Sequence, residues 1–441
     1  MTGVGRRHGI VAAVVSAIVA TGLAAQQAPV VPQAPLQVTL QEAVRRALDV
    51  QPAMVQARGE QRNAGASARS AWGAFLPTVI TSASASHSSD ATFRSGTTDT
   101  LPRLGYSYSG GLSANLVLFD GFSRFADLRT AAATQDAATA GFVNQRYQVT
   151  AATAQLFFTA LANEELVRVA QAQVERTKAE LQTAVNKFQA GAATRSDTLT
   201  ATVDLGNARL TLLQAQANLA TAQANLGRQV GVDQLVRAVP DSAFPPLPDT
   251  TTMRASALQT APLIRQAEAQ ASATGAQVWS ARSQYWPTLT VSYSNSRTGV
   301  GSPTLPLFNN YPETFTWRFG VSWTLFNGFG REQAQVSASV AHDVALAQAA
   351  DTRRQVNALY TQQLAATFTA WAQIGIAGAD VAAATEAVRV QQERYRLGAG
   401  TLLDLLTAQA NLTQAAVSQV QARYNYLIAR AQLEAIVGHT L

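Results

Sequence analysis

The chain has no cysteine and only two lysines, Lys178 and Lys187, among its 441 residues. Without cysteine it can form no disulfide scaffold, no zinc–thiolate site and no thiol nucleophile. Charged side chains make up 14% of the sequence, whereas about 25% is usual in soluble domains. Apolar side chains make up 47%, which excludes a disordered chain. The composition therefore predicts a folded protein with an unusually uncharged surface.

The sequence also lacks the patterns of catalysis and of nucleic-acid binding. Its four histidines, His8, His87, His342 and His439, are scattered, so we expect no metal site. Phosphate-binding glycine loops, H-E-x-x-H and G-x-S-x-G do not occur, so we expect no catalytic residue, no cofactor and no enzymatic activity. The net charge is +6, but no basic stripe with interleaved aromatic residues is present, and nucleic acid is not an expected partner.

Residues 1–25 have the pattern of a secretory signal peptide. Arg6 and Arg7 precede a short apolar run at 10–20, and small residues follow, with cleavage expected near Ala24 or Ala25. A membrane anchor needs about 20 apolar residues, and this run is shorter. Because no cysteine follows it, we expect an exported protein that is not lipid-anchored through an N-terminal cysteine.

Several motifs recur in the same order. Three of them return 207 residues later: Leu118-Phe119-Asp120-Gly121-Phe122 as Leu325-Phe326-Asn327-Gly328-Phe329, Lys187-Phe188-Gln189-Ala190-Gly191 as Arg394-Tyr395-Arg396-Leu397-Gly398, and Val230-Gly231 as Val437-Gly438. A fourth, around Pro77, returns around Pro287. Such recurrence indicates an internal duplication. We predict a first structural repeat at 36–238, a Pro-rich linker at 239–251 and a second repeat at 252–441.

Each repeat is predicted to contain a helix, a β-hairpin, a long helix and a returning helix. The first helix is expected at about 39–72. The hairpins are expected at 77–119 and 287–327, where apolar and small polar residues alternate with a period of two. Polar loops at 88–103 and 297–313 are expected to join the strands of each hairpin.

The four strands resemble membrane strands in length and pattern. They have about 10 residues, aromatic residues near their ends and small polar residues on the opposite face. The apolar face expected to meet lipid comprises Tyr106, Tyr108, Leu112, Trp317, Phe319, Val321 and Trp323. No apolar stretch after residue 25 is long enough for a membrane helix, so a bilayer could be crossed only by a closed barrel. Four strands are too few for one, since the smallest has about eight, and the chain must then oligomerise. A sheet packed on helices would alternate similarly and is the alternative.

Long helices are expected at 124–187 and 331–396, with returning helices at 197–229 and 404–436. At 1.5 Å per residue each long helix would extend about 95 Å. Alanine on several helix faces would allow each helix to contact two neighbours closely, as in a closed helical wall.

The tips of both predicted helical hairpins carry T-x-x-D, in the pairs Thr194/Asp197 and Thr401/Asp404. This is the pattern of a helix capping box. In an assembly around an axis, Asp404 would also repeat as a ring of carboxylates, which can select cations or serve in docking. A cap without further function is the alternative.

The segments 394–406 and 424–427, the strand ends with Leu-Phe-Asp/Asn-Gly and the internal duplication resemble the TolC-type outer-membrane efflux proteins. The resemblance implies a homotrimer with a 12-stranded outer-membrane β-barrel, four strands from each protomer, continued by a long α-helical periplasmic barrel. It implies a passive exit duct of a tripartite efflux or type I secretion system that conducts small molecules or polypeptides. The implied partners are outer-membrane lipid, a periplasmic adaptor (membrane fusion) protein and, through it, an inner-membrane pump or secretion ATPase. The alternative is a secreted coiled-coil scaffold or adhesin with a soluble sheet and no channel.

The resemblance also assigns site residues. Tyr395 and Asp197 match a periplasmic gate in which a tyrosine of the inner hairpin bonds an aspartate of the other tip, with Ser196 beside it and Asp404 in an acidic ring. The sequence departs from the family at Gly400, where an arginine is expected, and at Thr407, where a second acidic ring is expected. The expected adaptor-docking tips comprise Gly191, Ala190, Ala192, Gly398, Leu397 and Ala399.

Overall fold

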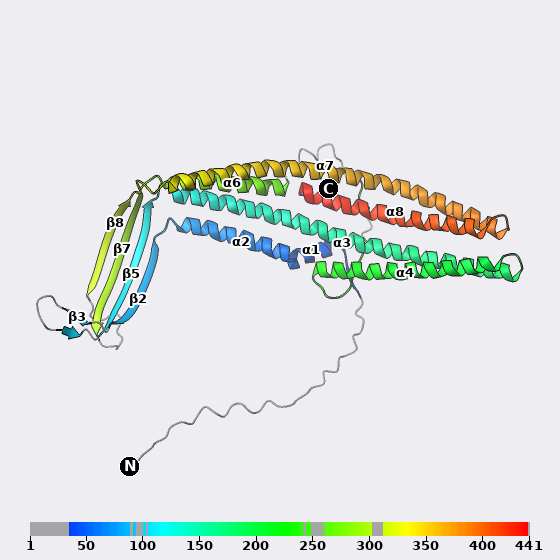
Figure 1. Ribbon diagram of the computed structural model, residues 1–441, viewed down its shortest axis with the longest axis horizontal. Helices are drawn as coiled ribbons and strands as arrows, with labels where there is room; N and C mark the ends of the chain where they lie inside the picture. Colours follow the sequence, from blue (N-terminus) through cyan, green and yellow to red (C-terminus); the bar gives the residue numbers. More distant parts are fainter. Residues whose placement is uncertain are drawn as a thin grey trace, which may run out of the picture.

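The computed structural model describes residues 35–88, 91–93, 100–102, 105–240, 244–247, 259, 261–301 and 312–439. The molecule is elongated, with a β-sheet at one end and the tips of two helical hairpins at the other (Figure 1). The predicted signal peptide and part of the predicted linker lie outside the described residues.

The first helical segment is broken, so the prediction of one helix at 39–72 was wrong. α1 (Leu40–Val50) and α2 (Pro52–Gly73) are separated by Gln51, whose backbone is extended at φ −62° and ψ 129°. Proline disfavours the helical conformation of the residue before it and is itself well suited to the first turn of a helix. Pro52 therefore ends one helix and begins the next.

A short parallel strand pair was not predicted. β1 (Leu36–Val38) pairs with β6 (Val236–Ala238), and Val38 and Val236 are both buried. They join a core cluster with Phe157 of the helix α3 (Ser123–Gln189) and Leu226 of the helix α4 (Arg195–Val230). Three-residue strands have too few residues to produce a recognisable sequence period, and their pairing joins segments about 200 residues apart.

The main sheet contains β2 (Thr78–Ser88), β5 (Gly105–Phe119), β7 (Thr288–Gly301) and β8 (Glu313–Ser322), in the order β2-β5-β7-β8. All neighbours are antiparallel. The β5–β7 pairing joins the two halves of the chain, and β2 and β8 form the two outer edges.

The strands extend into the segments predicted as loops. Arg297 of β7 faces Glu313 of β8, and their side chains form a salt bridge of 2.9 Å. In the first hairpin, β3 (Ala91–Phe93) and β4 (Thr100–Pro102) form a separate antiparallel pair. The remaining residues of both predicted loops lie outside the described residues.

The two faces of the sheet differ in polarity, as the alternation predicts. On one face Tyr293 lies opposite Trp317, with ring centroids 4.9 Å apart. On the other face, Ser84 and Ser109 are hydrogen-bonded at 2.7 Å and Ser86 and Ser107 at 2.6 Å. An irregularity between Val117 and Phe119 interrupts the alternation at Leu118.

Both repeats turn from strand to helix in the same way. Gly121 and Phe122 have φ of 66° and 67°, and Gly328 and Phe329 have φ of 66° and 65°. A bulky residue rarely adopts positive φ, so its occurrence at both positions marks a specific turn. A Cβ at Gly121 would lie 2.5 Å from the carbonyl oxygen of Ser283, so this position also requires glycine for close packing.

In the described part of the chain, five further helices form the elongated region: α3 (Ser123–Gln189), α4 (Arg195–Val230), α6 (Pro262–Ser283), α7 (Gly330–Arg396) and α8 (Leu402–Val437). The 67 residues of α3 correspond to about 100 Å. α2, α3, α6 and α7 pack side by side in the order of the strands to which they connect (Figure 1). Among the described residues, no helix combines the length and the apolarity that a membrane span requires.

Candidate functional site

The backbones of the two hairpin tips adopt the same conformation. Gly191 and Gly398 adopt left-handed conformations, with φ of 73° and 77°. The next residue closes each turn: the Ala192 N–H donates to Lys187 and the Ala399 N–H to Arg394, both at 2.8 Å. Glycine is favoured in this helix-terminating position because it lacks the steric penalty of a Cβ.

Both predicted capping boxes are present. The Thr194 N–H donates to the Asp197 carboxylate at 2.9 Å, and the Asp197 N–H donates to the Thr194 hydroxyl at 3.2 Å. Thr401 and Asp404 repeat these bonds at 3.1 and 3.2 Å. The Thr401 hydroxyl also donates to Asp404 at 2.7 Å, and these bonds lower the pKa of the Asp404 carboxyl. Asp404 is exposed, as a ring of charges would require.

The predicted gate residues come together at the tips, on different helices. Tyr395 is 6% exposed, and its hydroxyl has no hydrogen-bond partner among the described residues. Burial, together with the negative charge of Asp197 and Glu180, raises its pKa. Asp197 therefore lies close enough to act on Tyr395 electrostatically, while Ser196 is exposed beside it. No hydrogen bond joins Tyr395 to Asp197 within the described residues of the single protomer, and the gate bond stays a prediction for the assembled protein.

Sequence reasoning missed Lys187. Its ammonium group lies 3.8 Å from the centroid of the Tyr395 ring and donates a hydrogen bond to the Tyr395 carbonyl. The available signal was its rarity, since the chain has two lysines, but rarity alone does not identify a contact.

A partly buried polar layer behind the tips was also missed. We use this name for Arg176 and Glu180 of α3, Asp204 of α4, and Gln409 and Thr413 of α8. Glu180 is 6% exposed. Burial, and then the negative charge of Asp204, raise its pKa to about 7 against the opposing charge of Arg176. Arg176 donates to the Thr413 hydroxyl at 3.3 Å, so the layer joins the two hairpins.

The residues predicted for adaptor docking lie on the turns. Leu397 is 73% exposed, an unusual exposure for a leucine, and Leu403 beside it is equally exposed. The other predicted tip residues are exposed as well: Ala190, Gly191, Ala192, Gly398 and Ala399. The tips thus present apolar surface without any covering segment among the described residues.

The predicted lipid-facing belt lies on the sheet. Phe319 is 76% exposed, and the other members on or beside β8 are exposed too: Trp317, Val321 and Trp323. Leu112 is exposed on β5, and Tyr108 is partly exposed. Tyr106 belongs to β5 by its backbone pairing, but its side chain lies outside the described part of the chain.

A cavity of about 500 Å³ lies where the sheet meets the helices. Its lining combines aromatic rings with two guanidinium groups: Phe122, Phe125, Arg129, Trp279, Arg282 and Trp286. The Arg282 guanidinium lies 5.6 Å from the Trp279 ring centroid. Tryptophan and arginine together are typical of a membrane–water boundary.

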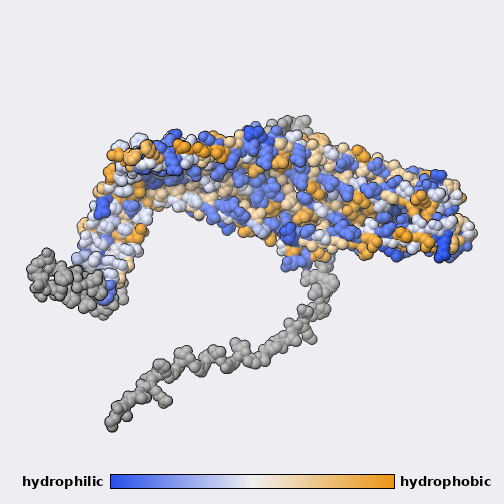
Figure 2. Space-filling model, viewed as in Figure 1, coloured by the Kyte–Doolittle hydropathy of each residue, from blue (hydrophilic) through white to orange (hydrophobic). Residues whose placement is uncertain are grey.

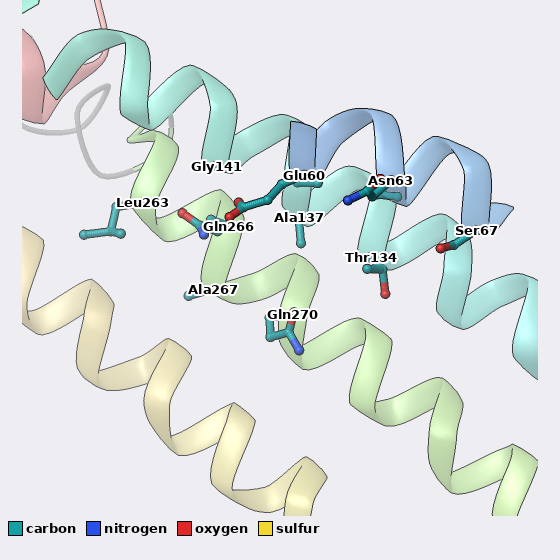
Figure 3. A pocket seen from close by; sticks show the side chains of 12 residues that line it. Glu60, Asn63, Ser67, Thr134, Ala137, Gly141, Leu263, Gln266, Ala267 and Gln270 are labelled. Carbon is teal, nitrogen blue, oxygen red and sulfur yellow. The ribbon is translucent and has the colours of Figure 1, made fainter. Parts of the chain in front are cut away.

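A groove of about 610 Å³ runs along a different face of α3 and α6, bordered by α2. Glu60 of α2 and Gln266 of α6 point toward one another next to Gly141 of α3 (Figure 3). The side chains in the groove are mainly small or polar, among them Asn63, Ser67, Thr134 and Gln270. Such a lining suits contact with water.

A family model described as outer membrane efflux protein matches the chain twice, over residues 43–232 and 254–439. The outer membrane efflux protein BepC of Brucella suis biovar 1 (strain 1330) is 28% identical over 336 residues, 72% of this chain and 69% of BepC. The protein CyaE of Bordetella pertussis (strain Tohama I) is 27% identical over 335 residues, 72% of this chain and 66% of CyaE. The chain thus spans about two thirds of the length of these relatives.

The fold is similar to that of the CmeC outer membrane channel of Campylobacter jejuni. The TM-score is 0.78 at 20% identity, covering 90% of this chain and 85% of CmeC. The architecture of sheet, long helices and hairpin tips is therefore that of an outer-membrane channel subunit. The chain belongs to the outer membrane efflux protein family.

Proposed function

We propose that this protein is the passive outer-membrane exit duct of a tripartite efflux or type I secretion system. It would conduct exported small molecules or polypeptides and catalyse no reaction. The observation that carries the proposal is the open four-stranded sheet, whose strands connect directly to helices that run to exposed, paired tips. The helical part would lie in the periplasm, and the predicted signal peptide at residues 1–25 would direct export of the chain.

The proposed assembly is a homotrimer. The edges β2 and β8 each leave one side of a strand available for pairing with a neighbouring protomer, and three protomers of four strands would form a 12-stranded barrel. Exposed leucines and a valine on α4 follow a heptad-like spacing that suits helix–helix contact: Leu199, Val203, Leu210 and Leu213. On α7, apolar surface gathers where the helix leaves the sheet, at Val336, Val340 and Val344 (Figure 2).

The exposed aromatic face of β8 supports contact with lipid, and the Trp/Arg cavity supports a membrane boundary at the sheet–helix junction. The serine-rich face of the sheet and the polar groove would then line the water-filled path. At the far end, the exposed tips with Leu397 and Leu403 would dock a periplasmic adaptor protein, which links the duct to an inner-membrane pump or secretion ATPase.

The alternative, a secreted scaffold or adhesin, is not favoured, because the family and the fold are those of outer-membrane efflux proteins. Three experiments separate the possibilities. A duct should require detergent for solubility and show heat-modifiable migration, and deletion of its gene should abolish export. A protein that stays soluble without detergent, with export unchanged by deletion, would exclude the duct.

A further inference from the structure

The seam between the two helical hairpins contains unusual buried chemistry. Counting only contacts among the described residues, five buried side-chain atoms lack a hydrogen-bond partner along a short stretch of α3 and α7: Gln173 Oε1, Arg176 Nε, Glu180 Oε2, Gln391 Oε1 and Tyr395 Oη. Buried polar atoms are normally paired, because leaving one unpaired costs free energy. This concentration, within about five helical turns of the tips, indicates that the packing of the two hairpins leaves several buried polar groups unsatisfied here.

Glu180 occupies the centre of this seam. α3 and α8 run antiparallel, so the contact from Arg176 to Thr413 places Glu180, one turn nearer the tip, level with the buried Gln409. No ion pair within 4.0 Å joins Glu180 to Arg176 in the described residues, although both lie on one helix face. A buried carboxylate without a close cation is costly, whereas the protonated carboxyl is neutral.

The charged groups that face Glu180 from the neighbouring helices also favour its protonated form. Asp204 of α4 adds a second carboxyl to the layer, and Tyr395 of α7 is close enough for its pKa to respond to Glu180. Asp197 and Lys187 lie nearer the tips and act on Tyr395. α8 contributes the neutral side chains of Gln409 and Thr413. Arg176 is therefore the cation that opposes the two carboxyls within the polar layer.

We propose that Glu180 is a positioning residue of the tunnel entrance whose protonation holds the two hairpins of each protomer together and whose deprotonation loosens them. This inference rests on the proposed function only in that the loosened tips would admit substrate. Glu180 acts through the packing of α3 against α4, α7 and α8, with no requirement for contact with a transported molecule.

The sign of the pH dependence follows from proton linkage. In the closed packing the pKa of Glu180 is about 7, and its ordinary value is 4.5. The closed state therefore binds the proton more tightly than a state in which Glu180 meets water. The stability that this proton gives to the closed state is complete below the ordinary pKa of 4.5 and is lost as the pH rises toward 7. Between these values the closed-to-open ratio should fall by at most about tenfold per pH unit in each protomer.

The test is hydrogen–deuterium exchange of α3 residues 173–187 in the purified full-length protein from pH 5 to 8, corrected for the intrinsic pH dependence of exchange, with bilayer conductance measured in parallel. Wild-type exchange and conductance should rise over this range. Glu180→Gln should remain protected at every pH. Glu175→Gln removes the same charge from an exposed position on the same helix and should behave like wild type.

Asp204→Asn provides a second variant that keeps Glu180. It removes the neighbouring negative charge, so the midpoint of the transition should move to lower pH. The proposal is overturned if Glu180→Gln retains the wild-type pH dependence, or if Asp204→Asn leaves the midpoint unchanged. If the exchange responds as expected but no conductance occurs at any pH, the inference stands and the proposed duct function fails.

Discussion

The Lys187 ammonium group lies against the face of the Tyr395 ring, 3.8 Å from its centroid, and donates a hydrogen bond to the carbonyl of the same residue. Lys187 lies in the last turn of α3 and Tyr395 in the last turn of α7, and these helices belong to different halves of the chain. One side chain thus connects the two hairpin tips by two interactions. In the proposed duct, these tips form the entrance.

Replacing Lys187 by methionine should loosen the entrance. Methionine keeps most of the apolar stem but removes both the cation–π contact and the hydrogen bond. Because the site is only half-buried, we expect a loss of roughly 1–2 kcal/mol, which corresponds to about a 5- to 30-fold shift toward the open state. Dye leakage through cells that carry the variant measures the shift. Lys178→Met removes the other lysine, which is exposed, and should change nothing; equal leakage in both variants would exclude the contact as a restraint.

The predicted gate can be separated from the capping box by two changes at Asp197. Asp197→Ala removes both the predicted acceptor for Tyr395 and the capping bond to Thr194, and should raise conductance and leakage. Asp197→Asn keeps a capping oxygen and an acceptor while removing the charge, so its effect should be smaller. Single-channel recording measures both. Unchanged conductance in Asp197→Ala would show that no contact between Tyr395 and Asp197 restrains the entrance.

Asp404 should make the entrance sensitive to divalent cations. Three copies would place three carboxylates around the axis, and Asp404→Asn should weaken block by a divalent cation such as Mg²⁺ about tenfold or more. The bonds from Thr401 lower the pKa of Asp404 below its ordinary 3.8, so its negative charge, and the block, should persist as the pH falls to about 4 and disappear only below that.

A gain of function completes this test. Thr407 is exposed one turn from Asp404, where the family pattern has a second acidic residue. Thr407→Asp should therefore strengthen the block. A block that is the same in wild type, Asp404→Asn and Thr407→Asp would show that the aspartate serves only as a helix cap.

Two exposed leucines test different interfaces and serve as controls for each other. Leu210 of α4 is 66% exposed in the single protomer and belongs to the surface expected to meet a neighbour. Leu210→Glu should dissociate the trimer in size-exclusion chromatography in detergent, because a charge would be buried without a partner. Leu397→Glu, at the tip, should keep the trimer and lose adaptor binding in a pull-down. The reverse pattern would contradict both assignments.

The order of helices and strands along the chain could be predicted from the sequence, because each element is marked by a signal from neighbouring residues. The period of two, the T-x-x-D caps and the tip glycines each report on neighbouring residues, and duplication doubled every signal. Predictions failed for the pairing of β1 with β6, which is non-local, and for the extension of β7 to face Glu313, because the polar sequence there has the composition of a loop. The break before Pro52 had a local signal, proline itself, which the uniform Ala- and Gln-rich composition outweighed.

The residues of the candidate site also fall into those that the sequence could predict and those that it could not. Asp197, Asp404 and Tyr395 stood out by motif, and the tips hold them where the motif implied. Glu180 did not, since Arg176 and Glu180 have the spacing of an ordinary solvent-exposed ion pair on a helix. Only the packing of α4 and α8 onto this face of α3 buries them and gives Glu180 its raised pKa of about 7.

Planar-bilayer recording of the purified oligomer tests directly whether the assembled protein is a conducting duct. We expect discrete conductance steps after insertion, with larger steps or longer openings in the Lys187→Met and Asp197→Ala variants. An oligomer that inserts into the bilayer but gives no conductance at any voltage or pH, in wild type and in both variants, would contradict the proposed duct function.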